Sequence, residues 1–412
     1  MLRSAKVLLS LLLAGCCLLS GCSLFGQSSS SEDGDSEPEK VSSGSSSNST
    51  PGATVPATEY YAATADTPEP VDDSTITYNS YEIKRNIDEI DETLDNILDY
   101  HKYCGALYVK FGNDYETTRE RGTANTGAHI KNSIHTSVYA GELTRLVTAI
   151  AVLQLSEEKE LNLKTTKLDR YFPNCPYAKD VTVDQLLTMT SGIPDYVQET
   201  KGSLKEPVAA IAGKLKENDA VGNRNTILNW ILSQQRTASA AAYSPSNSNY
   251  YLLGEIIAKE SGESCEDYIK NHVFLPIYMT KSGFAADEST ARPYTGNENS
   301  AKMLYPGVGS SALGLVTNVS DLLRLVDSMM YNNLISQQEF QTLFTDYGNG
   351  YGYGAEVHGI RVTCIGSLDA YKTKLSFTTN NNQIFIALSN DINSSPDEIH
   401  RLLRDYLSKF RN

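Results

Sequence analysis

The sequence predicts an α/β (α+β) fold in which both ends of the folded part build one sheet and the middle forms an inserted, mostly helical region. Three observations support this prediction. Runs of β-branched and aromatic residues typical of strands occur early in the folded part and again near its end. Amphipathic helical patterns lie outside both groups of strands. The long segment between the groups, roughly residues 156–335, has helical and loop patterns and few strand signals.

The first folded element is expected to be an amphipathic helix that begins near Tyr81. Its apolar residues recur at helical spacing, with acidic residues on the other faces, at Ile83, Ile87, Ile90, Leu94 and Ile97. Residues 104–112 then read as a strand, residues 112–114 as a turn, and residues 115–122 as the returning strand. A strand hairpin is therefore expected after the first helix.

One later helix is expected to be buried, because the run from Leu146 to Leu155 is apolar nearly all round. The C-terminal part returns to strand patterns, at residues 351–357, 360–366, 374–379 and 383–390. A last amphipathic helix is expected from Pro396 to about Phe410. These elements complete a folded body that spans residues 81–412.

The N-terminus has the features of a bacterial export signal. Two basic residues precede an apolar run at residues 7–19, which is too short to span a bilayer. The run ends in Leu-Ser-Gly-Cys, which resembles a lipobox, so residues 1–22 are expected to be a lipoprotein signal peptide with Cys22 as the lipidated residue. Cys16 ends a second match upstream. This predicts an extracytoplasmic protein held on the bacterial cell membrane by its lipid.

Residues 23–80 are expected to form a disordered tether rich in Ser, Thr, Gly and Pro, because they contain almost no large aliphatic residues to bury. They hold ten Asp and Glu against one Lys, which accounts for −9 of the net charge of −15. Like charges along the tether repel each other and extend it. The acidic balance of the chain argues against nucleic acid as a partner.

Four cysteines remain in the body, at Cys104, Cys175, Cys265 and Cys364. Outside the cytosol, such wide spacing permits disulfides without requiring them. The six His residues are scattered and no Cys-x-x-Cys spacing occurs. The sequence therefore predicts no metal site and no cofactor.

Four segments match a known family in the same order along the chain: residues 148–163, 181–196, 246–284 and 310–330. They resemble the serine β-lactamase and penicillin-binding-protein-like family, the branch with class C β-lactamases, D-aminopeptidases and related esterases. Met189 stands where the second segment usually has His. The resemblance covers residues 81–412 and implies a mixed, mainly antiparallel sheet flanked by helices, plus an inserted helical domain with the site in the cleft between.

In this family a Ser at the start of the buried helix attacks a carbonyl, and a Lys one turn later accepts its proton. Counting back from Gln154 aligns Glu142 with the Ser and Arg145 with the Lys. A carboxylate has no hydroxyl, and a guanidinium does not lose its proton in proteins. The two can instead form an ion pair at i, i+3. Ser137, the nearest upstream serine, has Ala140 in place of the Lys and is expected to be an ordinary loop or cap residue.

The two other motifs of the family are also changed. The Tyr-x-Asn motif aligns with Pro245, Ser246 and Asn247, so its Asn remains and its Tyr is lost. Tyr243 could replace that Tyr only if the loop rearranged. The strand motif, Lys- or His-x-Gly, aligns with Cys364-Ile365-Gly366, so its Gly remains. Lys372 and Lys374 come too late to replace the lost Lys.

Three motifs that each lack the reactive residue favour a pseudoenzyme, a lipid-tethered protein that binds a peptidoglycan peptide, another peptide or a partner protein in its cleft. The candidate ligand-binding residues are Glu142, Arg145, Tyr243, Ser246 and Asn247. An active esterase or peptidase remains open, with the Cys364 thiol or the Glu142 carboxylate as a displaced nucleophile. A purely structural module with a vestigial cleft also remains open.

Overall fold

The structure is a computed structural model that describes residues 77–412 except residues 200–204, 238–241 and 296–304. The expected signal peptide with Cys16 and Cys22, and the expected tether up to residue 76, lie outside the described residues. No helix in the described part is long and apolar enough to cross a bilayer.

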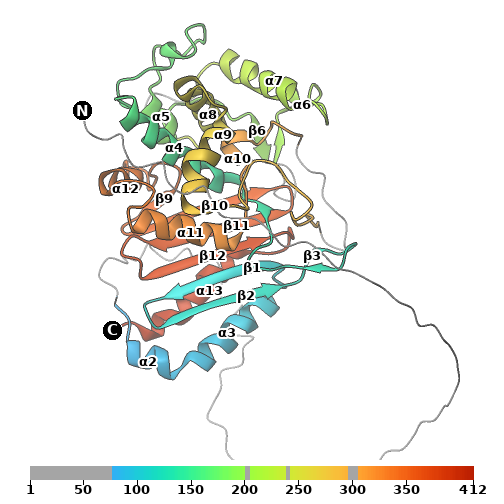
Figure 1. The fold of residues 1–412 in the computed structure, drawn as a ribbon, viewed down its shortest axis with the longest axis vertical. Coiled ribbons are helices and arrows are strands. Elements are labelled where there is room, and N and C mark those ends of the chain that lie inside the picture. The colour runs from blue at the N-terminus through green and yellow to red at the C-terminus, as the bar shows by residue number, and fades with distance from the viewer. Residues whose placement is uncertain (1–76, 200–204, 238–241, 296–304) are drawn as a thin grey trace, which may run out of the picture. The chain divides into compact units, whose positions relative to one another are not determined.

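A six-stranded sheet of order β2-β1-β12-β11-β10-β9 lies at the centre of the described body (Figure 1). All its pairings are antiparallel. Its strands are β1 (Gly105–Phe111), β2 (Tyr115–Arg121), β9 (Glu356–His358), β10 (Arg361–Leu368), β11 (Tyr371–Thr378) and β12 (Gln383–Ser389). β1 pairs with β12 over its whole length, from Gly105 opposite Ser389 to Phe111 opposite Gln383. The expectation that both ends of the body build one sheet is therefore confirmed.

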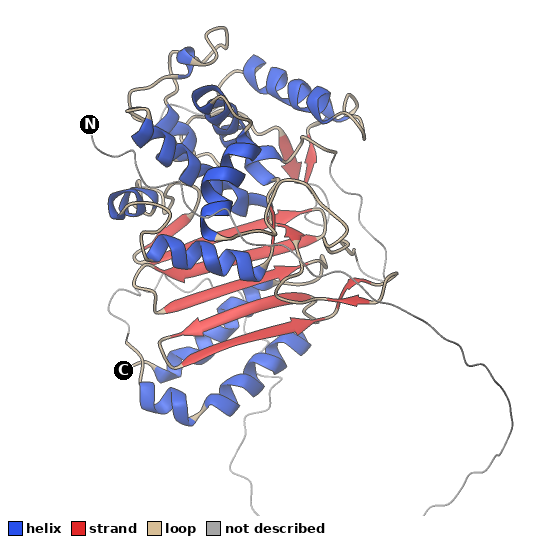
Figure 2. Ribbon diagram, viewed as in Figure 1, coloured by secondary structure: helices blue, strands red, loops and turns tan. Residues whose placement is uncertain are grey.

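Helices from both ends cover one face of this sheet (Figure 2). The expected N-terminal helix is two helices, α2 (Ser80–Arg85) and α3 (Ile87–Tyr100), which meet at Asn86. The Asn86 side chain donates to the Glu82 carbonyl at 2.7 Å, a local bond that competes with a continuous helix. The expected last helix is α13 (Pro396–Leu407), followed by the short turn η6 (Ser408–Phe410). The apolar faces of α3 and α13 form a separate buried cluster against β1 and β12.

Helices of the middle of the chain pack on the other face (Figures 1 and 2). The expected buried helix is α4 (Thr144–Glu158), whose residues from Leu146 to Leu153 are all buried. It begins directly after the short turn η2 (Gly141–Leu143) and packs against α8 (Asn247–Ser261). α11 (Val319–Met330) packs on β1 and β12 beside it. The start of α4 thereby faces β10.

The remaining described elements are short, except for α7. The helices are α5 (Val183–Leu187), α6 (Ala209–Ala212), α7 (Ala220–Ser233), α9 (Cys265–Ile269), α10 (Ser310–Leu313) and α12 (Gln337–Leu343), with turns η3 (Leu168–Arg170), η4 (Lys270–Phe274) and η5 (Leu275–Ile277). The strand pairs are β3 (Thr123–Asn125) with β4 (Ile130–Lys131), β5 (Val138–Tyr139) with β8 (Val316–Thr317), and β6 (Val197–Glu199) with β7 (Lys205–Pro207). The last pair forms a ribbon beside the start of α4.

One expected strand is mostly not a strand. Residues 351–357 were expected to be extended, but regular pairing begins only at Glu356. Gly354 has φ +82°, and a Cβ there would lie 2.7 Å from the Arg145 carbonyl oxygen. The chain therefore turns where it passes the first turn of α4, in a conformation that favours glycine.

His400 is the buried histidine of α13. It is 5% exposed and stacks on Phe385 with ring centroids 4.4 Å apart. Burial lowers its pKa well below the usual value, and the positive charges of Lys374, Arg361 and Arg404 lower it further. The folded state therefore holds this imidazole neutral.

His400 predicts a loss of stability in mild acid. Below pH about 6.5 the imidazole of His400 binds a proton in the unfolded state but not in the folded state. The free energy of unfolding therefore falls as pH falls, by at most about 1.4 kcal/mol per pH unit. His400→Gln cannot take that proton, so its loss between pH 7.5 and pH 5.5, measured by urea unfolding, is expected to be smaller than that of the wild type. The matched control is His135→Gln at an exposed position. Equal losses in His400→Gln and the wild type would contradict the prediction.

Candidate ligand-binding cleft

The site begins at the close approach of η2 to β10. Gly141 has φ +58°, and a Cβ on it would lie 2.6 Å from the Ser367 amide nitrogen. Gly366 is just as confined, because its Cβ would lie 2.0 Å from the Ala140 carbonyl oxygen. The two glycines therefore let the turn before α4 lie directly on the strand. This brings the side chain of Glu142 against the backbone of β10.

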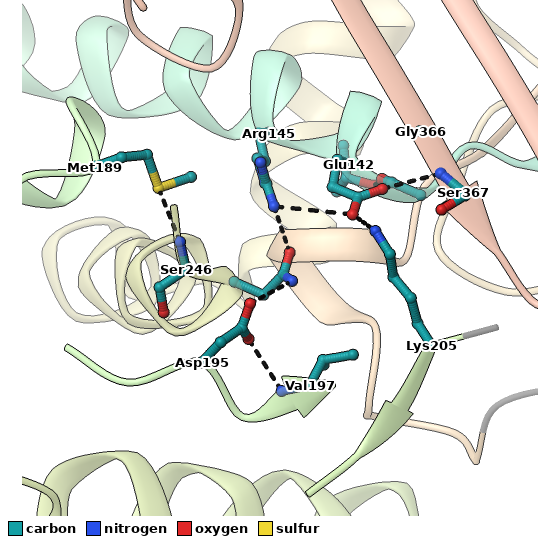
Figure 3. A network of polar contacts seen from close by, with 12 residues as sticks. Glu142, Arg145, Met189, Asp195, Val197, Lys205, Ser246, Gly366 and Ser367 are labelled. Atoms are coloured by element: carbon teal, nitrogen blue, oxygen red, sulfur yellow. Dashed lines mark hydrogen bonds and ion pairs between the residues drawn. The ribbon is translucent and has the colours of Figure 1, made fainter. Parts of the chain in front are cut away.

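Glu142 is held by contacts from three elements. Its Oε2 accepts a hydrogen bond from the Ser367 N–H at 2.9 Å. Its Oε1 contacts the Lys205 ammonium and lies 4.0 Å from Nη2 of Arg145. The expected ion pair with Arg145 is thus present, but Lys205 of β7 is the nearer partner. Figure 3 shows Lys205 reaching Glu142 from the side opposite Arg145.

Arg145 is fixed by a chain of polar contacts to Asp195. Its Nη2 donates to Oδ1 of Asn247 at 2.8 Å, and Nδ2 of Asn247 donates to Oδ2 of Asp195 at 2.9 Å. The other oxygen of Asp195 accepts from the Val197 N–H at 3.0 Å (Figure 3). Burial raises the pKa of Asp195, and these hydrogen bonds together with the Arg145 charge oppose the rise. Asp195 therefore positions Arg145 through Asn247.

These groups surround a cavity of about 360 Å³. Its lining residues are Glu142, Arg145, Asp195, Val197, Gln198, Glu199, Lys205, Pro245, Asn247, Ile365, Gly366 and Ser367. Burial and the charge of Lys372 lower the pKa of Lys205 to about 8. The Glu142 carboxylate acts in the opposite direction, because it favours the charged ammonium. The cleft thus holds a compact set of paired charges, and Glu142, which lies just ahead of α4, carries a carboxylate instead of a hydroxyl.

Known proteins resemble this chain in sequence. The sequence profile of the family described as Beta-lactamase matches residues 95–407. The chain belongs to the β-lactamase family. PbpX of Bacillus subtilis is 26% identical over 312 residues, which cover 74% of this chain and 75% of PbpX. Penicillin-binding protein 4* of the same species is 25% identical over 339 residues, which cover 74% of this chain and 72% of that protein.

A solved structure agrees with the fold. The penicillin-binding protein from Bacillus halodurans superposes with a TM-score of 0.66 at 23% identity, covering 76% of this chain and 99% of that one. The family and fold expected from the sequence are therefore confirmed. The antiparallel sheet, the flanking helices and the helical part on one face are those expected of a β-lactamase fold.

Five of the residues aligned with the motifs of the β-lactamase family line the cavity: Glu142, Arg145, Pro245, Asn247 and Gly366. Ser246 does not, because its hydroxyl caps α8 by accepting from the Ser248 N–H at 3.2 Å. Met189 supports that turn, since its Sδ accepts from the Ser246 N–H at 3.5 Å (Figure 3). Tyr243 also lies outside the lining and packs on Tyr351, with ring centroids 5.7 Å apart.

Cys364 lies behind the cleft rather than in it. Its side chain is 4% exposed, and its Sγ is 3.8 Å from the Gly354 carbonyl oxygen. Burial raises the pKa of the thiol, with a smaller contribution from Glu356. A buried thiol with a raised pKa is a poor nucleophile. None of the four cysteines of the body forms a disulfide in the part of the chain that the structure describes.

Among the lining residues that were not expected, three make polar contacts within the site: Asp195, Lys205 and Ser367. Asp195 belongs to the family-like segment at residues 181–196, so its neighbourhood was visible in the sequence. Lys205 follows no motif, and only the β6–β7 ribbon brings it to Glu142. Ser367 contributes its backbone N–H, which residue identity does not reveal.

The contact between η2 and β10 predicts a large effect of one methyl group. Gly366→Ala would place a Cβ 2.0 Å from the Ala140 carbonyl oxygen and 2.5 Å from Oγ1 of Thr373. Backbone atoms cannot rotate away, so the free energy of unfolding is expected to fall by about 1–3 kcal/mol in denaturant titrations. Gly213→Ala is the matched control, because its Cβ would have no atom within 4 Å. A Gly366→Ala protein as stable as the Gly213→Ala protein would disprove the close approach.

Proposed function

We propose that this protein is a non-hydrolysing member of the β-lactamase family that is anchored by a lipid on Cys22 outside the cytoplasm. Its cleft binds a ligand of the cell envelope: a peptidoglycan peptide, another peptide or a partner protein. One observation carries the proposal. The Glu142 carboxylate stands at the start of the buried helix and accepts the Ser367 N–H at 2.9 Å.

The residues at this point lack two requirements of acyl transfer, and the Glu142–Ser367 contact occupies a third. Glu142 offers no hydroxyl where the family has its nucleophile, and Arg145 cannot take up a proton. A backbone N–H aimed into the site is the kind of donor that stabilises a tetrahedral oxyanion. Here the Ser367 N–H is already engaged by Glu142. The cleft nevertheless keeps a cavity of about 360 Å³, within the range of small-ligand sites.

A second candidate function is an active esterase or peptidase with displaced catalytic groups. The observation that favours it is the Lys205 amine, whose pKa is lowered to about 8 and which touches the Glu142 carboxylate. An amine of that basicity is a usable proton acceptor near neutral pH. The candidate predicts turnover of ester or amide substrates that Glu142→Ala abolishes. The buried Cys364 thiol lends it no support.

The absence of acylation is tested by intact mass. The full-length chain is incubated with a reactive penicillin and, separately, with a fluorophosphonate, and the expected result is an unchanged mass. The reagents are checked on an active penicillin-binding protein, and Glu142→Ser with Arg145→Lys tests whether restoring the first motif restores reactivity. A stoichiometric adduct on the natural chain, mapped to one residue, would overturn the proposal.

Binding in the cleft is tested by titrating soluble peptidoglycan fragments into the full-length chain and measuring heat or thermal stabilisation. Binding is expected to weaken at least about tenfold in Arg145→Met, because a hydrogen bond from a charged group contributes about 1.5–3 kcal/mol. Arg324→Met, an exposed position on α11, removes the same charge and is expected to leave binding unchanged. Fragments that bind all three proteins equally would place the ligand outside the cleft.

A further inference from the structure

We infer that the cleft contains a recognition site for a primary ammonium group, that Lys205 of the chain itself occupies this site, and that the ligand presents a primary amine there. The inference rests on the proposed function and names the chemistry of its ligand. Lys205 then acts as an internal competitor that the ligand replaces.

The first argument is that the anionic half of the site is fixed independently of Lys205. Glu142 belongs to η2 at the entry of α4, and the Ser367 N–H holds its Oε2 at 2.9 Å. Lys205 belongs to another part of the chain, β7 of the β6–β7 ribbon, and meets the opposite oxygen (Figure 3). Removal of the lysine side chain therefore leaves a carboxylate already oriented toward the vacated space.

The second argument is the charge of the lining. Among the described residues, Glu142, Asp195 and Glu199 line the cavity together with two cations, Arg145 and Lys205. Nη2 of Arg145 is engaged by Asn247. Without Lys205 the described lining would hold three acidic side chains and one guanidinium, with the Lys372 charge nearby, so acidic groups would still outnumber the cations and the vacated space would favour a cation.

The third argument concerns the kind of cation. An ammonium is a compact charge with three N–H donors, whereas a quaternary ammonium has none. Glu142 needs a donor on Oε1, because its Oε2 is occupied and its side chain is only 11% exposed. Glu199 stands directly opposite Lys205 in the β6–β7 pairing and offers a further acceptor at the exposed end. A primary amine on an aliphatic stem reproduces what Lys205 supplies.

The fourth argument is that the exchange is energetically feasible. An ion pair that loses one partner leaves an uncompensated charge, which is unfavourable in a partly buried site. A ligand ammonium that takes the place of Lys205 restores the pair at once. Burial disfavours the charged form of Lys205, as its lowered pKa of about 8 reflects, so its side chain regains hydration when it leaves. The replacement therefore exchanges one ammonium for another on the same carboxylate.

The test removes the internal competitor and offers a simple amine. Calorimetric titration of the full-length Lys205→Ala protein with n-butylammonium is expected to give a dissociation constant about tenfold or more below that of the wild type, because the site no longer has to exchange its own lysine. Tetramethylammonium, which has no N–H donor, is expected to show no such gain. Lys214→Ala is the charge-matched control at an exposed position and is expected to behave as the wild type. Glu142→Gln combined with Lys205→Ala is expected to lose the gain.

Lys205→Met keeps the aliphatic stem and repeats the measurement if Lys205→Ala fails to fold. No gain in either variant, or an equal gain with tetramethylammonium, would overturn the amine site. Neither outcome bears on hydrolysis, which the acylation test decides. An adduct with penicillin would instead overturn the non-hydrolysing function while leaving the amine measurement valid.

Discussion

The turn that begins α4 lies directly on β10, and the geometry of the cleft depends on that contact. Gly141 and Gly366 meet there without side chains, and Oγ1 of Thr373 on β11 donates to the Ala140 carbonyl at 2.8 Å. None of these atoms belongs to the side chain of residue 142, so the contact does not depend on which side chain stands there. The fold therefore keeps its shape with Glu142 in the place where a hydroxyl is usual in the family. Scaffold and chemistry are separable at this point of the chain.

Most of the charged groups that line the cleft contact one another, directly or through Asn247. Glu142 pairs with Lys205 and Arg145, and Arg145 connects through Asn247 to Asp195. In a half-buried site, a group left alone would cost more than the pair gains, so each member stabilises the positions of the others.

Much of this architecture was readable from the sequence, and the exceptions have physical causes. Periodicity predicted α4, the β1–β2 hairpin and the three C-terminal strands β10 to β12, because each buries a regular face. Motif spacing predicted Glu142, Arg145 and Asn247 at the cleft. It did not predict Lys205, whose position depends on how a short ribbon packs rather than on local pattern. The break at Asn86 and the turn at Gly354 depend on a single side-chain bond and a single close contact, which periodicity does not register.

The pairing of β1 with β12 also determines when the sheet can be completed during synthesis. Gly105 can pair with Ser389, and α3 can pack beside α13, only after nearly the whole chain has been synthesised. Until then β1 has its hairpin partner β2 on one side and an open edge on the other. An open edge is a template for pairing with other chains, and contacts so distant in sequence form slowly. The last strand and helix, β12 and α13, therefore complete the sheet and its covering layer only at the end of synthesis. A chain that stops before them would leave one edge of β1 unpaired and open to pairing with other chains.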